Sequence, residues 1–223
     1  MRRKILLTTT LSLLTITSTI AASVPAFAAD ISQISITGMD NLSQETQLKI
    51  NDAFKNVSDD VVRLYNAIGG EVNFVDELLD RGMGKQQDLM GLYFLDNSDI
   101  QVRADDATEN NPNTYIPGSF MHEIGHFIYH KTAPFLSDES KAALQSCYTY
   151  WSQYSPECYN EDETFATMYA WDKAGMSDLD ESTLAMIREA ESICGVLAEH
   201  MENGQEVGPG IDITAETAEL SAQ

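Results

Sequence analysis

The sequence contains few basic residues. Its 13 Lys and Arg stand against 35 Asp and Glu, so the formal net charge is −22 at pH 7. A surface this acidic repels nucleic acids and anionic membranes, and we therefore expect neither as a partner. The charge does not identify a substrate, because it would steer a basic peptide toward the protein but would serve solubility equally well.

Long apolar runs are absent after residue 28, so no later segment is expected to span a bilayer. Before it, three basic residues at positions 2–4 precede an apolar segment, rich in Thr and Ser, that extends to about residue 22. Small residues stand at the −3 and −1 positions of a cut after Ala28, and the whole pattern is typical of a secretory signal peptide. The frequent Thr and Ser argue against a membrane anchor. We expect a secreted, extracellular protein whose mature chain, residues 29–223, has 195 residues and a formal charge of −25.

Cysteine is also scarce, with Cys147, Cys158 and Cys194 alone. No C-x-x-C spacing occurs, so a Cys/His zinc site is not indicated. An oxidising compartment permits a disulfide, and an odd count leaves one thiol over. We expect a Cys147–Cys158 bridge that closes a short loop, with Cys194 buried and reduced. Pairing of Cys194 with either of the others stays an alternative.

Residues 122–126 read HEIGH, which is the HExxH pattern. On a helix, His122 and His126 lie one turn apart on one face, where both imidazoles can bind one metal ion. Glu123 is a candidate general base beside them. Zinc is the expected metal, because imidazole ligands with one open position are its usual catalytic arrangement. His130 shares this face and is expected either to support the ligands or to be merely exposed. The alternative is a set of surface histidines on an ordinary helix.

A catalytic zinc site needs a third protein ligand, and Glu163 is the best candidate. It begins the segment 163–171, which reads ETFATMYAW. Small residues on its face of the expected helix would let two helices approach closely: Ala166, Thr167 and Ala170. The alternative is an ordinary acidic first turn, which the helix dipole favours. We expect Glu161 and Asp162 to have that role.

These two segments, HEIGHFIYH and ETFATMYAW, resemble the anthrax-lethal-factor-like zinc peptidases, which include the secreted Pro-Pro endopeptidases. The pattern of that family is HExxH, followed on the next helix by EFFAEAFAY, whose first Glu is the third ligand. The resemblance covers about residues 118–172. It implies a zincin-type fold with His122, His126 and Glu163 as zinc ligands and Glu123 as the base.

The chain departs from the family pattern at three positions. Thr167 replaces the second Glu, and Thr164 replaces the first Phe. Pro156 stands where the family has a catalytic Tyr, seven residues before the third ligand. Tyr154 and Tyr159 flank that position. Either is a candidate to stabilise the oxyanion, and Tyr154 is favoured.

The expected fold is α+β: a mainly helical, single-domain, zincin-type metallopeptidase with a small sheet before the metal-binding helix. The domain would span residues 29–202, with a loose start to about residue 41, and residues 203–223 would be a disordered acidic tail. Two strand-like runs, 92–95 and 100–103, predict a hairpin. This hairpin would either bind a peptide as an added strand or only cover the core. Helices are expected over residues 43–68 with a break near 58–60, 118–133, 137–154, 162–174 and 181–199, with a strand at 71–75.

The expected function is a zinc endopeptidase, in which Glu123 takes a proton from a metal-activated water and delivers it to the leaving amine. A protein or peptide would be the substrate, and we expect a monomer. One alternative is a catalytically silent, peptidase-like binding protein, which the departures at Thr167 and Pro156 would explain. Another is a zinc-carrying protein without catalysis, in which Glu123 would have no purpose. The four intact site residues favour the enzyme.

Overall fold

The computed structural model describes residues 30–78, 89–104, 116–175 and 179–205, together with Ile213 and Thr217. This part of the chain forms an α+β fold that is mainly helical with one four-stranded sheet, as predicted. The predicted signal peptide, residues 1–28, lies outside the described residues. The helices are α1 (Gln44–Phe54), α2 (Asp59–Ile68), α3 (Ile116–Thr132), α4 (Asp138–Trp151), α5 (Glu161–Lys173) and α6 (Glu181–Glu202). The strands are β1 (Ser35–Thr37), β2 (Glu71–Val75), β3 (Gly91–Tyr93) and β4 (Ile100–Arg103).

The sheet has the strand order β1-β2-β4-β3, so β3 lies at one edge. Strands β1, β2 and β4 are parallel, whereas β3 is antiparallel to β4. The predicted hairpin is therefore confirmed, with Tyr93 opposite Ile100. Strand β1 corrects the loose start predicted for residues 29–41, where residues 34–37 alternate apolar and polar side chains as a short strand does. Its pairing with β2 joins residues 36 positions apart, which only tertiary contact can establish.

The predicted helical stretch 43–68 is divided into α1 and α2, with the break near Ser58 as expected. Ser43 and Ser58 each accept a hydrogen bond from a backbone N–H in the first turn of the following helix. Such caps satisfy donors that have no partner inside the helix. Gly69 ends α2 in the left-handed conformation, at φ 80°, which glycine adopts without strain.

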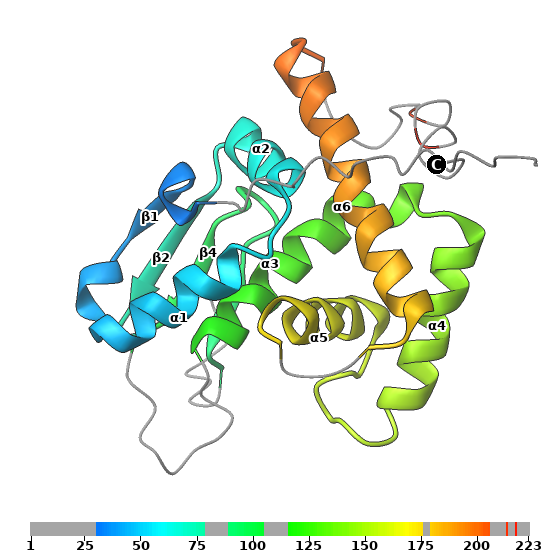
Figure 1. Cartoon of the computed structure of the whole chain (residues 1–223), viewed down its shortest axis with the longest axis horizontal. Coiled ribbons are helices and arrows are strands. Elements are labelled where there is room, and N and C mark those ends of the chain that lie inside the picture. The colour runs from blue at the N-terminus through cyan, green and yellow to red at the C-terminus, as the bar shows by residue number, and fades with distance from the viewer. Residues whose placement is uncertain are drawn as a thin grey trace, which may run out of the picture.

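Helix α3 occupies the centre of the molecule (Figure 1). It packs against α1 and strands β3 and β4, and also against α5 and α6. Its described part begins at Ile116, earlier than the predicted start signals, and Pro117 is tolerated in this first described turn. The side chain of Ile124, between the two histidines of the motif, is buried with the apolar core. One face of α3 therefore anchors the helix, and the polar face is left for the histidines.

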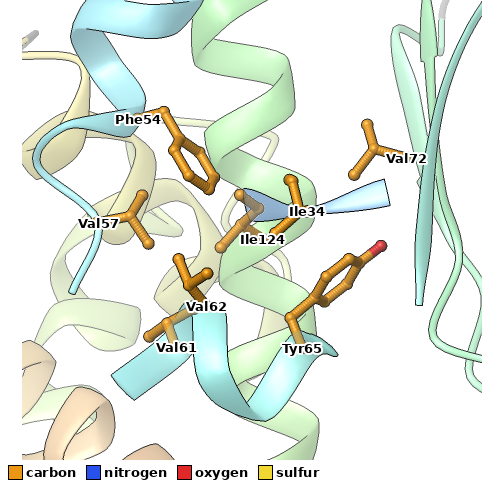
Figure 2. Close-up of a pocket in the computed structure, with 8 residues that line it drawn as sticks. All are labelled: Ile34, Phe54, Val57, Val61, Val62, Tyr65, Val72 and Ile124. Atoms are coloured by element: carbon orange, nitrogen blue, oxygen red, sulfur yellow. The ribbon is translucent and has the colours of Figure 1, made fainter. Parts of the chain in front are cut away.

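A small pocket lies on the core side of α3, where Ile124 faces side chains of α1, α2 and β2 (Figure 2). Its lining is apolar apart from the hydroxyl of Tyr65, which is buried without a hydrogen-bond partner. Burial raises the pKa of Tyr65 far above its usual value, so the phenol stays neutral. No ionisable group of the histidine motif faces this pocket, and we regard it as a packing gap of the core.

Helix α6 packs on α2 and α4 and completes the core. It extends to Glu202, three residues beyond its predicted end. Most of the tail expected to be disordered lies outside the described residues. Ile213, however, is buried in the hydrophobic core, so the expectation of disorder does not hold at that position. In the described parts of the chain, no helix has the length and apolarity needed to cross a membrane.

Candidate metal centre

Three side chains from two helices converge at one point. His122 and His126 come from α3, and Glu163 comes from the first turn of α5. Oε2 of Glu163 lies 3.2 Å from Nε2 of His122 and 3.6 Å from Nε2 of His126. The three ligand atoms all lie within 4.8 Å of one another. The residues predicted as metal ligands from the sequence are therefore brought together.

The spacing of these atoms fits a metal ion. Two ligand atoms at about 2.0–2.1 Å from a tetrahedral zinc ion are about 3.4 Å apart. The observed separations of 3.2 and 3.6 Å lie close to that value. Two imidazole nitrogens and one carboxylate oxygen are also ligands that divalent transition metals accept. The cluster could therefore hold one metal ion without rearrangement of the helices.

The close approach of α3 and α5 brings the ligands within reach of one another. A Cβ atom at Gly125 would lie 2.6 Å from Cα of Ala166, so only glycine permits this crossing. Ala166 and Thr167 are both buried in the contact region of α5, as the predicted small face requires. At the other end of α5, Lys173 forms an ion pair with Glu191 of α6 at 3.1 Å. These contacts set the position of α5 and thereby the position of Glu163.

Glu163 is held as an anion. Burial alone would raise its pKa, but hydrogen bonds with His122 and Tyr159 and the charges of the two motif histidines lower it on balance. The hydroxyl of Tyr159 donates to Oε1 at 2.8 Å, which leaves Oε2 directed at the histidines. Asn160 caps α5 by accepting a hydrogen bond from the backbone N–H of Glu163. The hydrogen bond from Tyr159 therefore orients the carboxylate, and the Asn160 cap fixes the backbone that carries it.

Asp162 has a role that the sequence did not predict. It was expected to be an ordinary acid of a first helical turn, but Oδ1 lies 2.6 Å from Nδ1 of His126 and Oδ2 lies 2.8 Å from Nε2 of His130. Burial would raise the pKa of Asp162, but these two hydrogen bonds hold it well below its usual range. Of the two alternatives for His130, the structure supports contact with the ligand network. In the sequence, the only signal for this contact was the position of His130, one helical turn beyond His126.

Asp162, His126 and His130 also form a second group of possible ligands. Its shortest separation, 2.6 Å, is too small for two ligand atoms of one tetrahedral ion and is the length of a charge-assisted hydrogen bond. His126 can use only one ring nitrogen toward a given ion. Its Nε2 faces Glu163, so the site formed with His122 is the better one.

Glu123 is buried beside this cluster, with only 6% of the residue exposed. It accepts a hydrogen bond from the backbone N–H of Tyr93 in strand β3. Burial raises the pKa of Glu123 to about 8, helped by the charges of Glu163 and Asp162 and opposed by His126. A dication bound nearby would favour the ionised form and lower this pKa. Gly91 lies against the same carboxylate, and a Cβ atom there would approach Oε1 to 2.5 Å.

The two candidate tyrosines have different positions. Tyr159 is bonded to Glu163, and this hydrogen bond raises the pKa of Tyr159 to about 12, so its hydroxyl remains a donor. Tyr154 is 69% exposed and packs on the ring of Tyr150, with centroids 5.1 Å apart. Of the two candidates, Tyr159 has a hydrogen bond with a ligand, whereas Tyr154, the one favoured from the sequence, contacts Tyr150.

The predicted Cys147–Cys158 disulfide is wrong, because all three cysteines are free and buried. Cys147 faces Thr183 of α6, with Sγ and Oγ1 3.2 Å apart. Burial raises the pKa of both Cys147 and Cys158, so both stay as inert thiols. Proximity in the sequence suggested the pairing, but α4 directs Cys147 toward a different helix.

The chain matches no protein-family model and no curated protein. We therefore infer a function from the chemistry of the cluster formed by α3 and α5.

Proposed function

We propose that the protein is a secreted zinc endopeptidase of the zincin type. The observation that carries this proposal is the convergence of His122, His126 and Glu163 at the spacing of a tetrahedral zinc site, beside the buried carboxylate of Glu123. Two imidazoles, one carboxylate and an open fourth position are a ligand set of catalytic rather than structural zinc. The resemblance to the anthrax-lethal-factor-like peptidases supports the same class, and the pattern of residues 1–28 supports secretion.

Each side chain has a defined task in this proposal. When bound, zinc would act as a Lewis acid that polarises the scissile carbonyl and lowers the pKa of its water to about 7. Glu123 takes the proton from water and passes it to the leaving amine. The N–H of Tyr93 and the surrounding core keep its carboxylate in one place. Tyr159 directs Glu163 through its hydrogen bond with Oε1, and its hydroxyl, in contact with a ligand, is our candidate for stabilising an oxyanion.

Strand β3 offers a binding edge for the substrate. Among the described strands it is the outermost, and the N–H of Tyr93 is directed to Glu123 rather than to β4. Within the described residues no strand pairs with the outer side of β3, which runs past the proposed base. An extended peptide that added to this edge as a further strand would bring its backbone to the metal site. This favours a peptide as substrate over a small metabolite.

The decisive experiment measures zinc content and peptide cleavage of the mature chain. We expect one zinc per chain by elemental analysis, and cleavage of a peptide library that a chelator abolishes and added zinc restores. Glu123→Gln should keep the metal and lose the activity, because only the proton shuttle is removed. Glu163→Ala should bind zinc more weakly, because a ligand is lost.

Two results would contradict this function. A protein without zinc would exclude the metal centre, and full activity of Glu123→Gln would exclude the assigned base. Zinc binding without any cleavage would instead support the alternative of a silent, peptidase-like binding protein. The cleavage sites found in the library would also define the sequence preference of the enzyme.

A further inference from the structure

The two carboxylate oxygens of Asp162 hold two different histidines. Oδ1 contacts Nδ1 of His126 at 2.6 Å, and Oδ2 contacts Nε2 of His130 at 2.8 Å. Both histidines lie on α3, one turn apart, whereas Asp162 lies on α5 next to the ligand Glu163. Asp162 therefore links the two helices that carry the metal ligands, at a point adjacent to the ligands themselves.

These hydrogen bonds determine which ring nitrogens carry protons. An ionised carboxylate can only accept, so Nδ1 of His126 and Nε2 of His130 must be the donors. In the neutral imidazole that binds a metal, a proton on Nδ1 leaves Nε2 of His126 with a free lone pair, and Nε2 is the atom that faces Glu163. The contact with Asp162 thus selects the tautomer of His126 that can bind a metal.

His130 is itself held by aromatic rings. It stacks on Tyr93 of strand β3, with centroids 5.7 Å apart and an angle of 22° between the planes. The ring of Tyr129 packs edge-on against it at 5.7 Å. Tyr93 is the same residue whose backbone N–H holds Glu123. Tyr93 therefore contacts the proposed base directly, and it is linked to the ligand His126 through His130 and Asp162.

We propose that Asp162 and His130 are positioning residues of the metal centre. Asp162 orients His126 toward the metal, and His130, seated against Tyr93, keeps Asp162 in the rotamer that does so. Without the hydrogen bond from His130, the second oxygen of Asp162 would be free to turn toward solvent and release His126. This inference rests on the proposed zinc site, but it concerns metal binding rather than peptide cleavage.

The test measures the affinity for Zn²⁺ by competition with a chromophoric chelator at fixed pH. It also records the visible spectrum of the protein loaded with Co²⁺, which reports ligand geometry. Asp162→Ala should weaken Zn²⁺ binding by about 10- to 100-fold, the usual effect of removing the partner of a ligating histidine, and should alter the Co²⁺ spectrum. Glu161→Gln is the matched control, since it removes one negative charge from the same helical turn. We expect it to keep wild-type affinity.

Two variants of His130 separate the hydrogen bond from the packing. In His130→Gln, the amide nitrogen can take the place of Nε2 and donate to Asp162, but the ring is lost. In His130→Phe, the ring can still pack on Tyr93, but no donor remains. We expect His130→Gln to bind Zn²⁺ within about threefold of wild type and His130→Phe to bind it about three- to tenfold more weakly, the effect of one hydrogen bond. Melting curves of the metal-free forms show whether each variant is folded.

Wild-type affinity in a folded Asp162→Ala variant would overturn this inference. Equal losses in His130→Gln and His130→Phe would overturn the part assigned to His130, because the donor would then make no difference. A wild-type protein that binds zinc but cleaves no peptide would contradict the proposed function alone, and the affinity series would still decide the role of Asp162. A wild-type protein that binds no zinc would overturn both.

Discussion

Replacement of Gly91 by alanine should displace the proposed base. A Cβ atom at this position would lie 2.5 Å from Oε1, 2.7 Å from Cγ and 2.9 Å from Cδ of Glu123. The side chain of Glu123 cannot move away freely, since it is buried and bonded to the N–H of Tyr93, two residues along the same strand. Gly91→Ala therefore acts first on the side chain of Glu123, whose atoms are the three nearest to the added Cβ atom.

The size of the effect follows from the required displacement. Ordinary contact between a Cβ atom and its neighbours begins at 3.4 Å, so Oε1 must move by about 0.9 Å. A misplacement of about 1 Å in a group that reacts with the substrate can lower the rate about a hundredfold. We expect kcat to fall by about that factor with little change in KM or zinc content. Overpacking of this kind should also lower the free energy of unfolding by about 1–3 kcal/mol.

The assay compares kcat, KM and zinc content of Gly91→Ala with those of Gly195→Ala. A Cβ atom at Gly195 would lie 2.6 Å from Cγ of Asp60, so this control introduces a similar clash with a carboxylate away from the metal site. The control should lose some stability and keep its kcat. A wild-type kcat in Gly91→Ala, or an equal loss in both variants, would refute the reasoning that places the base against β3.

Three further predictions concern the base, the tyrosines and the cysteines. In the metal-free protein, the pKa of Glu123 is raised from 4.5 to about 8, so the folded state holds this proton more tightly than the unfolded state. As the pH rises from 5 to 9, the free energy of unfolding of wild type should therefore fall by about 4 kcal/mol relative to that of Glu123→Gln. Urea-unfolding midpoints that change equally with pH in both proteins would contradict this prediction. Tyr159→Phe removes the hydroxyl that donates to Glu163 and that we propose stabilises the oxyanion, so kcat should fall about a hundredfold. Tyr154→Phe should leave kcat unchanged. The reverse result would restore the tyrosine favoured by the sequence. Alkylation of the unfolded, non-reduced chain should label Cys147 and Cys158, and a mapped disulfide between them would exclude the buried free thiols described here.

Several features of the fold could be predicted because their causes are local. The serine caps before α1 and α2, the stop at Gly69 and the hairpin of β3 and β4 all depend on residues close in the sequence. Strand β1 was missed although residues 34–37 alternate apolar and polar side chains, because so short a run identifies a strand only once its pairing with β2 is known. The pairing of cysteines failed for a related reason. Which helix Cys147 faces depends on the packing of α4 against α6, and no local pattern contains that information.

In the candidate site, too, some features have local causes and others depend on tertiary packing. Helical periodicity alone placed His122 and His126 on one face, and the small residues near Glu163 were enough to indicate a close helix partner. The role of Asp162 was decided only by the tertiary structure. It is one of three consecutive acids in the first turn of α5, and the rotation of α5 against α3 determines which of them meets which histidine.

That rotation depends on the contact between Gly125 and Ala166, which joins residues 41 positions apart. The small residues of α5 indicated that another helix comes close, but not which residue of that helix Ala166 meets. The environment of Glu123 likewise depends on segments that are distant in the sequence. The sequence determined that a carboxylate stands next to the first histidine of the motif. Its burial, its raised pKa and its contact with strand β3 exist only because the edge of the sheet closes over α3. The ligand types are therefore a property of the sequence, whereas the orientation of each ligand and the environment of the base are products of the packing between α3, α5 and β3.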